Sequence, residues 1–376
     1  MKRFFLLYFV FMSLLFGQFR ARTEINLPDI LGYKTLKCDF HMHTIFSDGN
    51  VWPTVRAEEA WREGLDAIAI TDHLEYTPHK EDVIIRYNRS SEIAKSHGDN
   101  LNMIVIKGSE ITRSMPPGHL NAIFLSDADK IKTDKWEDAV KEAVNQNAFI
   151  FWNHPGWSAQ LKEEGIKIYP EHLQLIEKGI LQGIEVVNDV EYYPKAFEWA
   201  LKYNLTIMSN SDIHDPVNLY FDFAEHEHRS KTLVFAKDKS PEAIKDALIN
   251  RRTAVYWKEG LIGEEKFLRP IFEKSISVDK NNLVFIGRET KLIQIKNISD
   301  VDYKLKLVQS DLDVDFPQTL TLKANKTVIM EVRPKSKDKN IEKKILAEYE
   351  IQNATIKPDE HLKYQFIFDA TIKPAK

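Results

Sequence analysis

Residues 36–49 read LKCDFHMHTIFSDG, a short apolar run that ends in two histidines and leads into a polar loop. We expect a β-strand over 36–41. Side chains at positions i and i+2 of an extended segment point to the same face. His41 and His43 can therefore reach one metal ion, and Asp48 in the following loop adds a carboxylate.

The same layout recurs along the chain. Further strands are predicted at 67–71, 103–108, 120–125, 148–152, 183–187 and 205–209. Between most of them lie helix-like segments, at 53–63, 81–95, 135–145, 171–178 and 194–202. A strand at 231–236 and a helix at 240–252 complete this region. Alternation of this kind predicts a mostly parallel α/β fold, for which a seven-stranded β/α barrel is the natural closure.

One connection breaks the pattern. Only SEITRSMPPG, residues 109–118, separates the third and fourth predicted strands. About ten residues are too few for a helical crossover between parallel strands. We therefore expect a hairpin, which brings Glu110 and His119 to the same rim.

Metal-ligand residue types follow most of these strands. The carboxyl ends of strands in parallel sheets and barrels are where binding sites are built. Six histidines and three carboxylates exceed the needs of one ion, so we expect two to three divalent ions, with zinc, manganese or iron all compatible. The predicted ligands are His41, His43, Asp48, His73, Glu110, His119, His154, Asp212 and His214.

Composition narrows the function. The chain has 376 residues, 43% of them hydrophobic, and 52 Lys and Arg against 56 Asp and Glu. A net charge of −4 gives no basic surface for nucleic acid. A single cysteine, Cys38, excludes an intrachain disulfide framework and a cysteine-built zinc site.

The N-terminus predicts export. Lys2 and Arg3 precede an apolar run to Phe16, shorter than the roughly 20 residues of a membrane span. We expect residues 1–18 to be a cleaved signal peptide, with an uncleaved anchor as the alternative. The mature protein would be periplasmic or extracellular, without stable membrane insertion.

The pattern of predicted strands and helices changes after Leu268. Short alternating strands with few helix signals predict a β-sandwich of about 100 residues. We therefore expect a metallohydrolase barrel over 30–265 and a C-terminal β-sandwich over 269–376.

The ordered motifs HMHTIFSDG, ITDH, GSE, GH, NHP and SDIH resemble those of the PHP (polymerase and histidinol phosphatase) superfamily of metal-dependent hydrolases. The resemblance implies a distorted seven-stranded β/α barrel with a trinuclear site on the nine predicted ligands. It also implies that Glu110 bridges two ions and that Asp48, His73 and His214 bind the third. The segments EITRSMPPGHLNAIFL and IEVVNDVEYYP look more narrowly like exported phosphodiesterases of this superfamily.

These features predict a phosphodiesterase in which a metal-bound hydroxide attacks the phosphorus of a small organic phosphate ester. Asp212 would orient the hydroxide and accept its proton, or act as a ligand alone. Arg113 offers a bidentate fork for phosphate oxygens, unless it faces solvent. His79 and Lys80 are candidate substrate contacts or leaving-group acids, with loop solvation as the alternative.

Two other functions remain open at this point. The same metal chemistry serves phosphate monoesters and carboxyl or carbamate esters. A metal-dependent binding module, whose sandwich recognises a partner, belongs to a different class.

Overall fold

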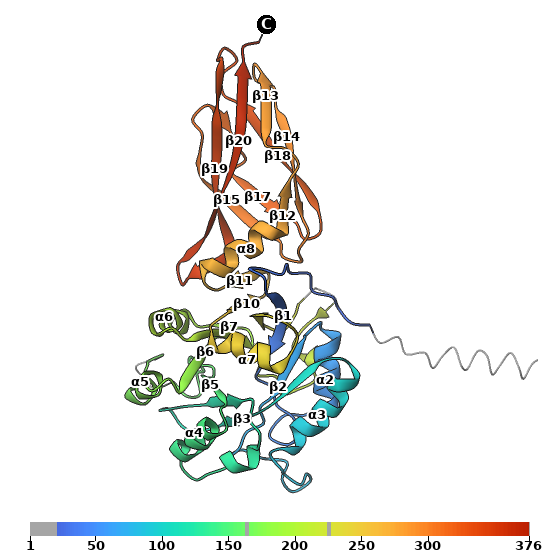
Figure 1. Cartoon of the computed structure of the whole chain (residues 1–376), viewed down its shortest axis with the longest axis vertical. Helices are drawn as coiled ribbons and strands as arrows, with labels where there is room; N and C mark the ends of the chain where they lie inside the picture. Colours follow the sequence, from blue (N-terminus) through green and yellow to red (C-terminus); the bar gives the residue numbers. More distant parts are fainter. Residues whose placement is uncertain (1–20, 162–164, 224–226, 376) are drawn as a thin grey trace, which may run out of the picture.

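The computed structural model describes residues 21–161, 165–223 and 227–375. An α/β part and an elongated all-β part are stacked along the long axis, with helix α8 (Glu265–Ser275) between them (Figure 1). The predicted signal peptide, residues 1–18, lies outside the described residues. Within the described ranges, no helix combines the length and the apolar character needed to cross a bilayer.

The α/β part follows the predicted alternation of strands and helices. Its strands are β1 Lys34–Asp39, β2 Ala67–Ile70, β3 Ile104–Ile111, β4 Leu120–Ile123, β5 Phe149–Trp152, β6 Leu181–Asn188, β7 Glu191–Tyr192, β8 Thr206–Asn210, β9 Lys231–Ala236, β10 Thr253–Trp257 and β11 Gly260–Ile262. Its helices are α2 Pro53–Arg62, α3 Arg89–Asn100, α4 Trp136–Asn145, α5 Pro170–Glu177, α6 Pro194–Tyr203 and α7 Pro241–Ile249, with 3₁₀ turns at Ala128–Ile131 and Val217–Leu219. Helices α2, α5, α6 and α7 each begin with a proline, whose fixed φ and missing N–H suit the first helical position.

The order of the strands places the predicted ligands at one edge of the α/β sheet. Strands β1, β2 and β3 are parallel neighbours, and β9 flanks β1 in the antiparallel direction. Strand β3 pairs antiparallel with β4, which confirms the predicted hairpin and sets Glu110 opposite Asn121. Strands β5, β6 and β8 then continue in parallel.

The mixed α/β character is confirmed, whereas a closed seven-stranded barrel stays a prediction. Strand β8 pairs through its backbone with β6. Side chains join it to β9 on the other side, because Thr232 Oγ1 accepts from Ser209 N at 2.9 Å and donates to Ser209 O at 2.7 Å. Strands β7, β10 and β11 were not predicted.

The strands are buried on both faces, which leaves their ends to carry polar groups. All four residues of β2, AIAI, are buried, as expected for a strand covered on both sides. One core cluster contains Cys38, Phe40, Phe149, Phe151 and Met208. The polar ligands that follow these strands therefore extend from a rigid apolar framework.

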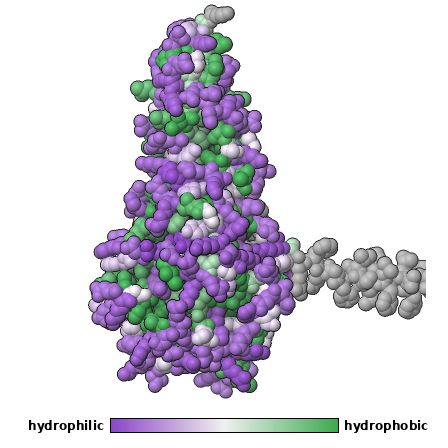
Figure 2. All heavy atoms as spheres, viewed as in Figure 1, coloured by the Kyte–Doolittle hydropathy of each residue, from purple (hydrophilic) through white to green (hydrophobic). Residues whose placement is uncertain are grey.

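The all-β part is a sandwich of two sheets (Figure 1). Its strands are β12 Ile276–Val278, β13 Asn282–Ile286, β14 Lys291–Asn297, β15 Tyr303–Ser310, β16 Val314–Asp315, β17 Thr319–Leu322, β18 Thr327–Pro334, β19 Ile341–Lys357 and β20 Glu360–Lys373. Strand β14 alternates buried and exposed residues, as expected when one face of a sheet packs on the core. The visible surface of the molecule is largely hydrophilic, with scattered hydrophobic residues on both parts (Figure 2).

The two parts share a core at their junction. Phe267, Leu268, Ile271 and Phe272 of α8 are buried in a cluster that draws residues from both parts. Strand β11 also pairs in parallel with β19. Helix α8 runs through the predicted boundary at 265–269 and continues to Ser275, so the first residues of the predicted sandwich are helical.

Candidate metal centre

The two histidines of the HMH segment lie side by side in the interior. His41 and His43 are both fully buried, and their Nε2 atoms are 3.1 Å apart. Met42 between them points into a different, apolar cluster with Ile213. The alternation of an extended segment therefore places both imidazoles on the ligand side, as predicted.

Glu110 lies at the centre of the cluster and is fully buried. Its Oε2 atom is 3.2 Å from His41 Nε2, 3.3 Å from His43 Nε2 and 3.1 Å from His73 Nδ1. Its other oxygen, Oε1, is 2.7 Å from His119 Nδ1 and 3.6 Å from His154 Nε2. The two oxygens therefore face different groups of histidines, which is the geometry of a bridging carboxylate.

The other two carboxylates close the cluster on the side nearer solvent. Asp212 Oδ1 is 3.0 Å from Nε2 of both His41 and His43. Asp48 lies 3.3 Å from His214 Nε2 and 3.5 Å from His73 Nε2. The side chains of Asp48 and Asp212 keep 19% and 18% exposure, so an entry route reaches this edge.

All nine predicted ligands thus meet in one place. Three sets of donor atoms each lie within 4.8 Å of one another: His43, Asp48, His73 and His214; His41, His43, Glu110 and Asp212; and His73, Glu110 and His119. His154 is outside these sets but lies 3.6 Å from Glu110 and 3.8 Å from Asp212.

The donor set fits divalent ions. Asp48 Oδ1 and His119 Nδ1 are buried atoms without a hydrogen bond, although each lies close to another member of the cluster, His214 Nε2 and Glu110 Oε1. Burial lowers the pKa of His43, but Asp212 and Glu110 outweigh it and raise that pKa to about 10. Burial opposes ionisation of Glu110, yet the surrounding histidines hold its pKa well below the ordinary value. A cation site requires carboxylates that converge on one point and atoms with lone pairs that can bind the ion. This cluster offers both.

A solved structure with the same two-part organisation is similar over nearly the whole chain. It is a two-domain protein of Bacteroides vulgatus that contains a predicted PHP-like metal-dependent phosphoesterase. The two chains are 45% identical with a TM-score of 0.87, covering 92% of this chain and 99% of that one. This chain belongs to the PHP-like metal-dependent phosphoesterases.

Two further comparisons each cover a portion of this PHP-like protein. Residues 276–367 match a family model described as an Ig-like domain. An uncharacterized protein of Methanocaldococcus jannaschii is 28% identical over 198 residues, which cover 50% of this chain and 85% of that protein.

Sequence reasoning missed Glu185, a positioning residue of this PHP-like site. Its buried carboxylate accepts from His154 N at 2.7 Å and lies 2.9 Å from His41 Nδ1. Asn188 and Asn210 donate to its two oxygens at 2.9 Å each. Such a partner fixes the ring orientation of a metal-ligating histidine. A carboxylate inside the apolar run IEVV was the available signal, because an unpaired buried charge is rare.

Asp72 performs a similar task for the loop that carries Asp48. Its Oδ1 accepts from Thr44 N at 2.7 Å and from Ser47 Oγ at 2.8 Å. Asp72 was noticed only as a neighbour of His73. Its buried carboxylate holds the loop after β1 against the end of β2.

Arg113 has other partners than the nine ligands. Its guanidinium forms an ion pair with Glu75 and donates to Thr112 O and Thr133 O at 3.0 Å each. Among the described residues, no contact joins Arg113, His79 or Lys80 to the ligand cluster. Lys80 is exposed, and buried His79 Nε2 has no hydrogen-bond partner. Their proposed roles toward substrate stay predictions.

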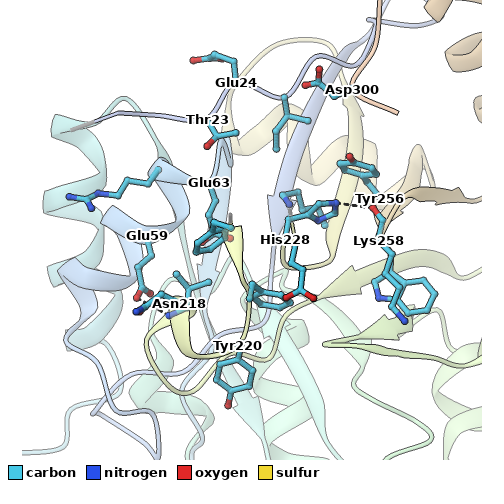
Figure 3. A pocket seen from close by; sticks show the side chains of 18 of the residues that line it. Thr23, Glu24, Glu59, Glu63, Asn218, Tyr220, His228, Tyr256, Lys258 and Asp300 are labelled. Carbon is cyan, nitrogen blue, oxygen red and sulfur yellow. Dashed lines mark hydrogen bonds between the residues drawn. The ribbon is translucent and has the colours of Figure 1, made fainter. Parts of the chain in front are cut away.

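A separate cavity of about 1540 Å³ lies at the junction of the two parts (Figure 3). It is bordered by Glu59 of α2 and Glu63 just after that helix, by Tyr220, and by His228 and Tyr256. None of the nine predicted ligands is among its lining residues. The metal centre and this cavity are therefore different regions of the surface.

Proposed function

We propose that this protein is an exported phosphodiesterase that hydrolyses a small organic phosphate ester at a centre of two to three divalent ions. The observation that carries the proposal is the largely buried nine-residue cluster, in which both oxygens of Glu110 face separate donor groups. We also interpret the α/β sheet as the distorted β/α barrel of this family, with side-chain bonds between β8 and β9 in place of a ladder.

Bound ions and residues of the chain have separate roles in the proposed hydrolysis. Bound divalent ions lower the pKa of water and neutralise charge on the phosphoryl oxygens. His41 and His43 hold one side of the centre, and Glu185 fixes the ring of His41. Asp212 lies at the more open edge, where its carboxylate orients the attacking water and accepts its proton.

A substrate comparison tests the reaction class. Metal-loaded protein is assayed with bis(p-nitrophenyl) phosphate, p-nitrophenyl phosphate and p-nitrophenyl acetate, and turnover is expected to be fastest with the diester. Fastest turnover of the monoester or the carboxylate ester would instead assign the corresponding esterase activity. No turnover by protein that holds its metals would favour a binding module.

Metal content and location are tested separately. Elemental analysis of the purified protein should give two to three ions per chain, of zinc, manganese or iron. Expression of the full chain should yield a periplasmic or secreted product that lacks about 18 N-terminal residues by mass spectrometry, as expected of a signal peptide. A product that keeps Met1 in the cytoplasmic fraction would overturn the proposed export.

A further inference from the structure

Two large aromatic side chains lie exposed beside the metal centre. Tyr76, in the loop after β2, is 54% exposed, and Trp157, in the turn after β5, is 42% exposed. The Tyr76 ring lies 6.1 Å from the ring of His73. The Trp157 ring lies 5.2 Å from that of His154 and 5.6 Å from that of His119.

These rings form a continuous row across the rim. The His73 and His119 rings are 5.7 Å apart and meet edge to face. Tyr76 therefore stands at one end of the row and Trp157 at the other, with two predicted ligands between them. Both of these ligands contact Glu110, so the row runs beside the central carboxylate of the cluster.

The loop that carries Tyr76 is anchored to the neighbouring hairpin. Glu75 Oε2 accepts from Thr112 N at 2.8 Å, and Arg113 pairs with the same carboxylate. Arg113 is in turn tied to Thr133 O. The guanidinium that sequence analysis assigned to the phosphate therefore holds the backbone next to Tyr76.

The turn that carries Trp157 is held equally firmly. Trp157 N donates to His154 O at 3.0 Å. Gly156 packs directly on the ring of Tyr193, because a Cβ at position 156 would lie 2.4 Å from Tyr193 Cδ1. Tyr193 is itself buried and donates to Glu191. Side chains held on fixed backbone lose little freedom when a ligand binds.

We propose that Tyr76 and Trp157 determine specificity by binding a flat aromatic group on the phosphate ester, so that the natural substrate carries an aryl or heteroaryl ring. The inference rests on the proposed function, since the metal centre holds the phosphoryl group and its ester group extends along the row. Aromatic rings favour stacked and edge-to-face contacts with other rings, which methyl or sugar groups do not offer.

Equilibrium binding to metal-loaded protein tests this without turnover. Calorimetry should show that phenylphosphonate binds at least tenfold more tightly than methylphosphonate. Trp157→Ala or Tyr76→Ala should remove most of that preference, whichever of the two rings the phenyl group contacts, and the phenylalanine variant at the same position should keep it. Trp257→Ala, whose ring contacts Tyr192 and Lys258, is the matched control and should leave it unchanged. Metal content and thermal midpoint are measured for every variant.

A second pair of probes distinguishes the two sources of a flat ring. Tighter binding of adenosine 5′-monophosphate than of ribose 5-phosphate would assign a nucleobase. A preference for phenylphosphonate alone would assign an aryl group attached directly to the phosphate. Equal binding of the two phosphonates would overturn the aromatic subsite while leaving a working phosphodiesterase intact. If neither phosphonate binds and no diester is hydrolysed, the proposed function itself fails.

Discussion

Two buried groups of charged side chains meet at Asp39 and His41, and they differ in how their charges are balanced. In the first, Arg229 is fully buried, donates to Glu63 at 2.9 Å and donates to Asp39 at 3.1 Å. In the second, the metal centre, imidazole nitrogens face one another and buried carboxylate and imidazole atoms lack partners. The two groups are joined by His41 N, which donates to Asp39 Oδ1 at 3.3 Å.

The comparison shows that burial and charge alone do not identify a site. The Arg229 group is complete within the chain, so it shapes the fold. The metal centre differs, because its carboxylates contact imidazoles of the same cluster, and both are residue types that bind metal ions. Only the second arrangement has a reason to take an ion from outside.

The largest effect is expected when the metal centre loses its central carboxylate. Glu110→Gln keeps the size of the side chain but removes the negative charge that both donor groups share. We expect diester turnover to fall by about 10²–10³-fold, as when charge stabilisation is removed from a transition state. Elemental analysis should show the loss of one or more ions. Glu137→Gln, at an exposed position of α4, is the control, and full metal content with full activity in Glu110→Gln would refute the bridging role.

Substitutions in the Arg229 group should instead lower the free energy of unfolding. Arg229→Met leaves Glu63 and Asp39 buried without their cation, which costs about 3–5 kcal/mol when one partner of a buried pair is removed. Urea unfolding measures this loss. Arg62→Met removes an exposed pair with Glu58 and should change little. A cost below about 1 kcal/mol for Arg229→Met would show that the fold does not depend on this group.

A smaller effect is expected for Glu185, which is not a predicted ligand but orients one of them. Glu185→Gln keeps the position of the group that orients His41 and weakens it as an acceptor. Metal affinity should fall by about 10–100-fold, as is typical when a hydrogen-bond partner of a ligand is changed. Chelator competition gives the affinity, and Glu177→Gln on α5 serves as the control. Unchanged affinity would limit Glu185 to a role in packing.

The last effect concerns pH and the Arg229 group. Burial lowers the pKa of Lys231 from 10.5 to about 7, with Glu63 opposing the shift and Arg229 adding to it. The unfolded chain then holds more protons than the folded chain between about pH 7 and 10.5, so stability from this residue rises with pH across that window. The slope is at most about 1.4 kcal/mol per pH unit. In Lys231→Met, the free energy of unfolding should vary less with pH across this window. In the control Lys195→Met, at an exposed position, the pH dependence should stay the same.

The sequence predicted the ligands well because they sit where strands end. Short buried strands such as β2 and β5 are readable as apolar runs, and the polar residues that follow them stand out. Partners from distant parts of the chain were not readable. The pairing of Arg113 with Glu75 crosses 38 positions and follows no local pattern.

Two helices show where local patterns mislead. Helix α3 was expected over 81–95 but begins at Arg89, because Asn88 is held by Asp127 and Asp129 from another loop. Helix α8 was not predicted, since Pro270 lies inside it and proline normally disfavours a helix interior. Burial of its apolar face between the two parts outweighs that preference.

The pairing of β11 with β19 gives the molecule a mechanical property. Leu261 pairs with Ala354 and Ile262 with Thr355, so the outer sandwich is not tethered by its connecting chain alone. A pull on β20 loads the long β19–β20 ladder in shear. That load passes through β11, β10 and β9 to β1, the strand that leads into His41 and His43. The strand that leads to the first two predicted metal ligands is therefore joined to the Ig-like part by an unbroken series of paired strands.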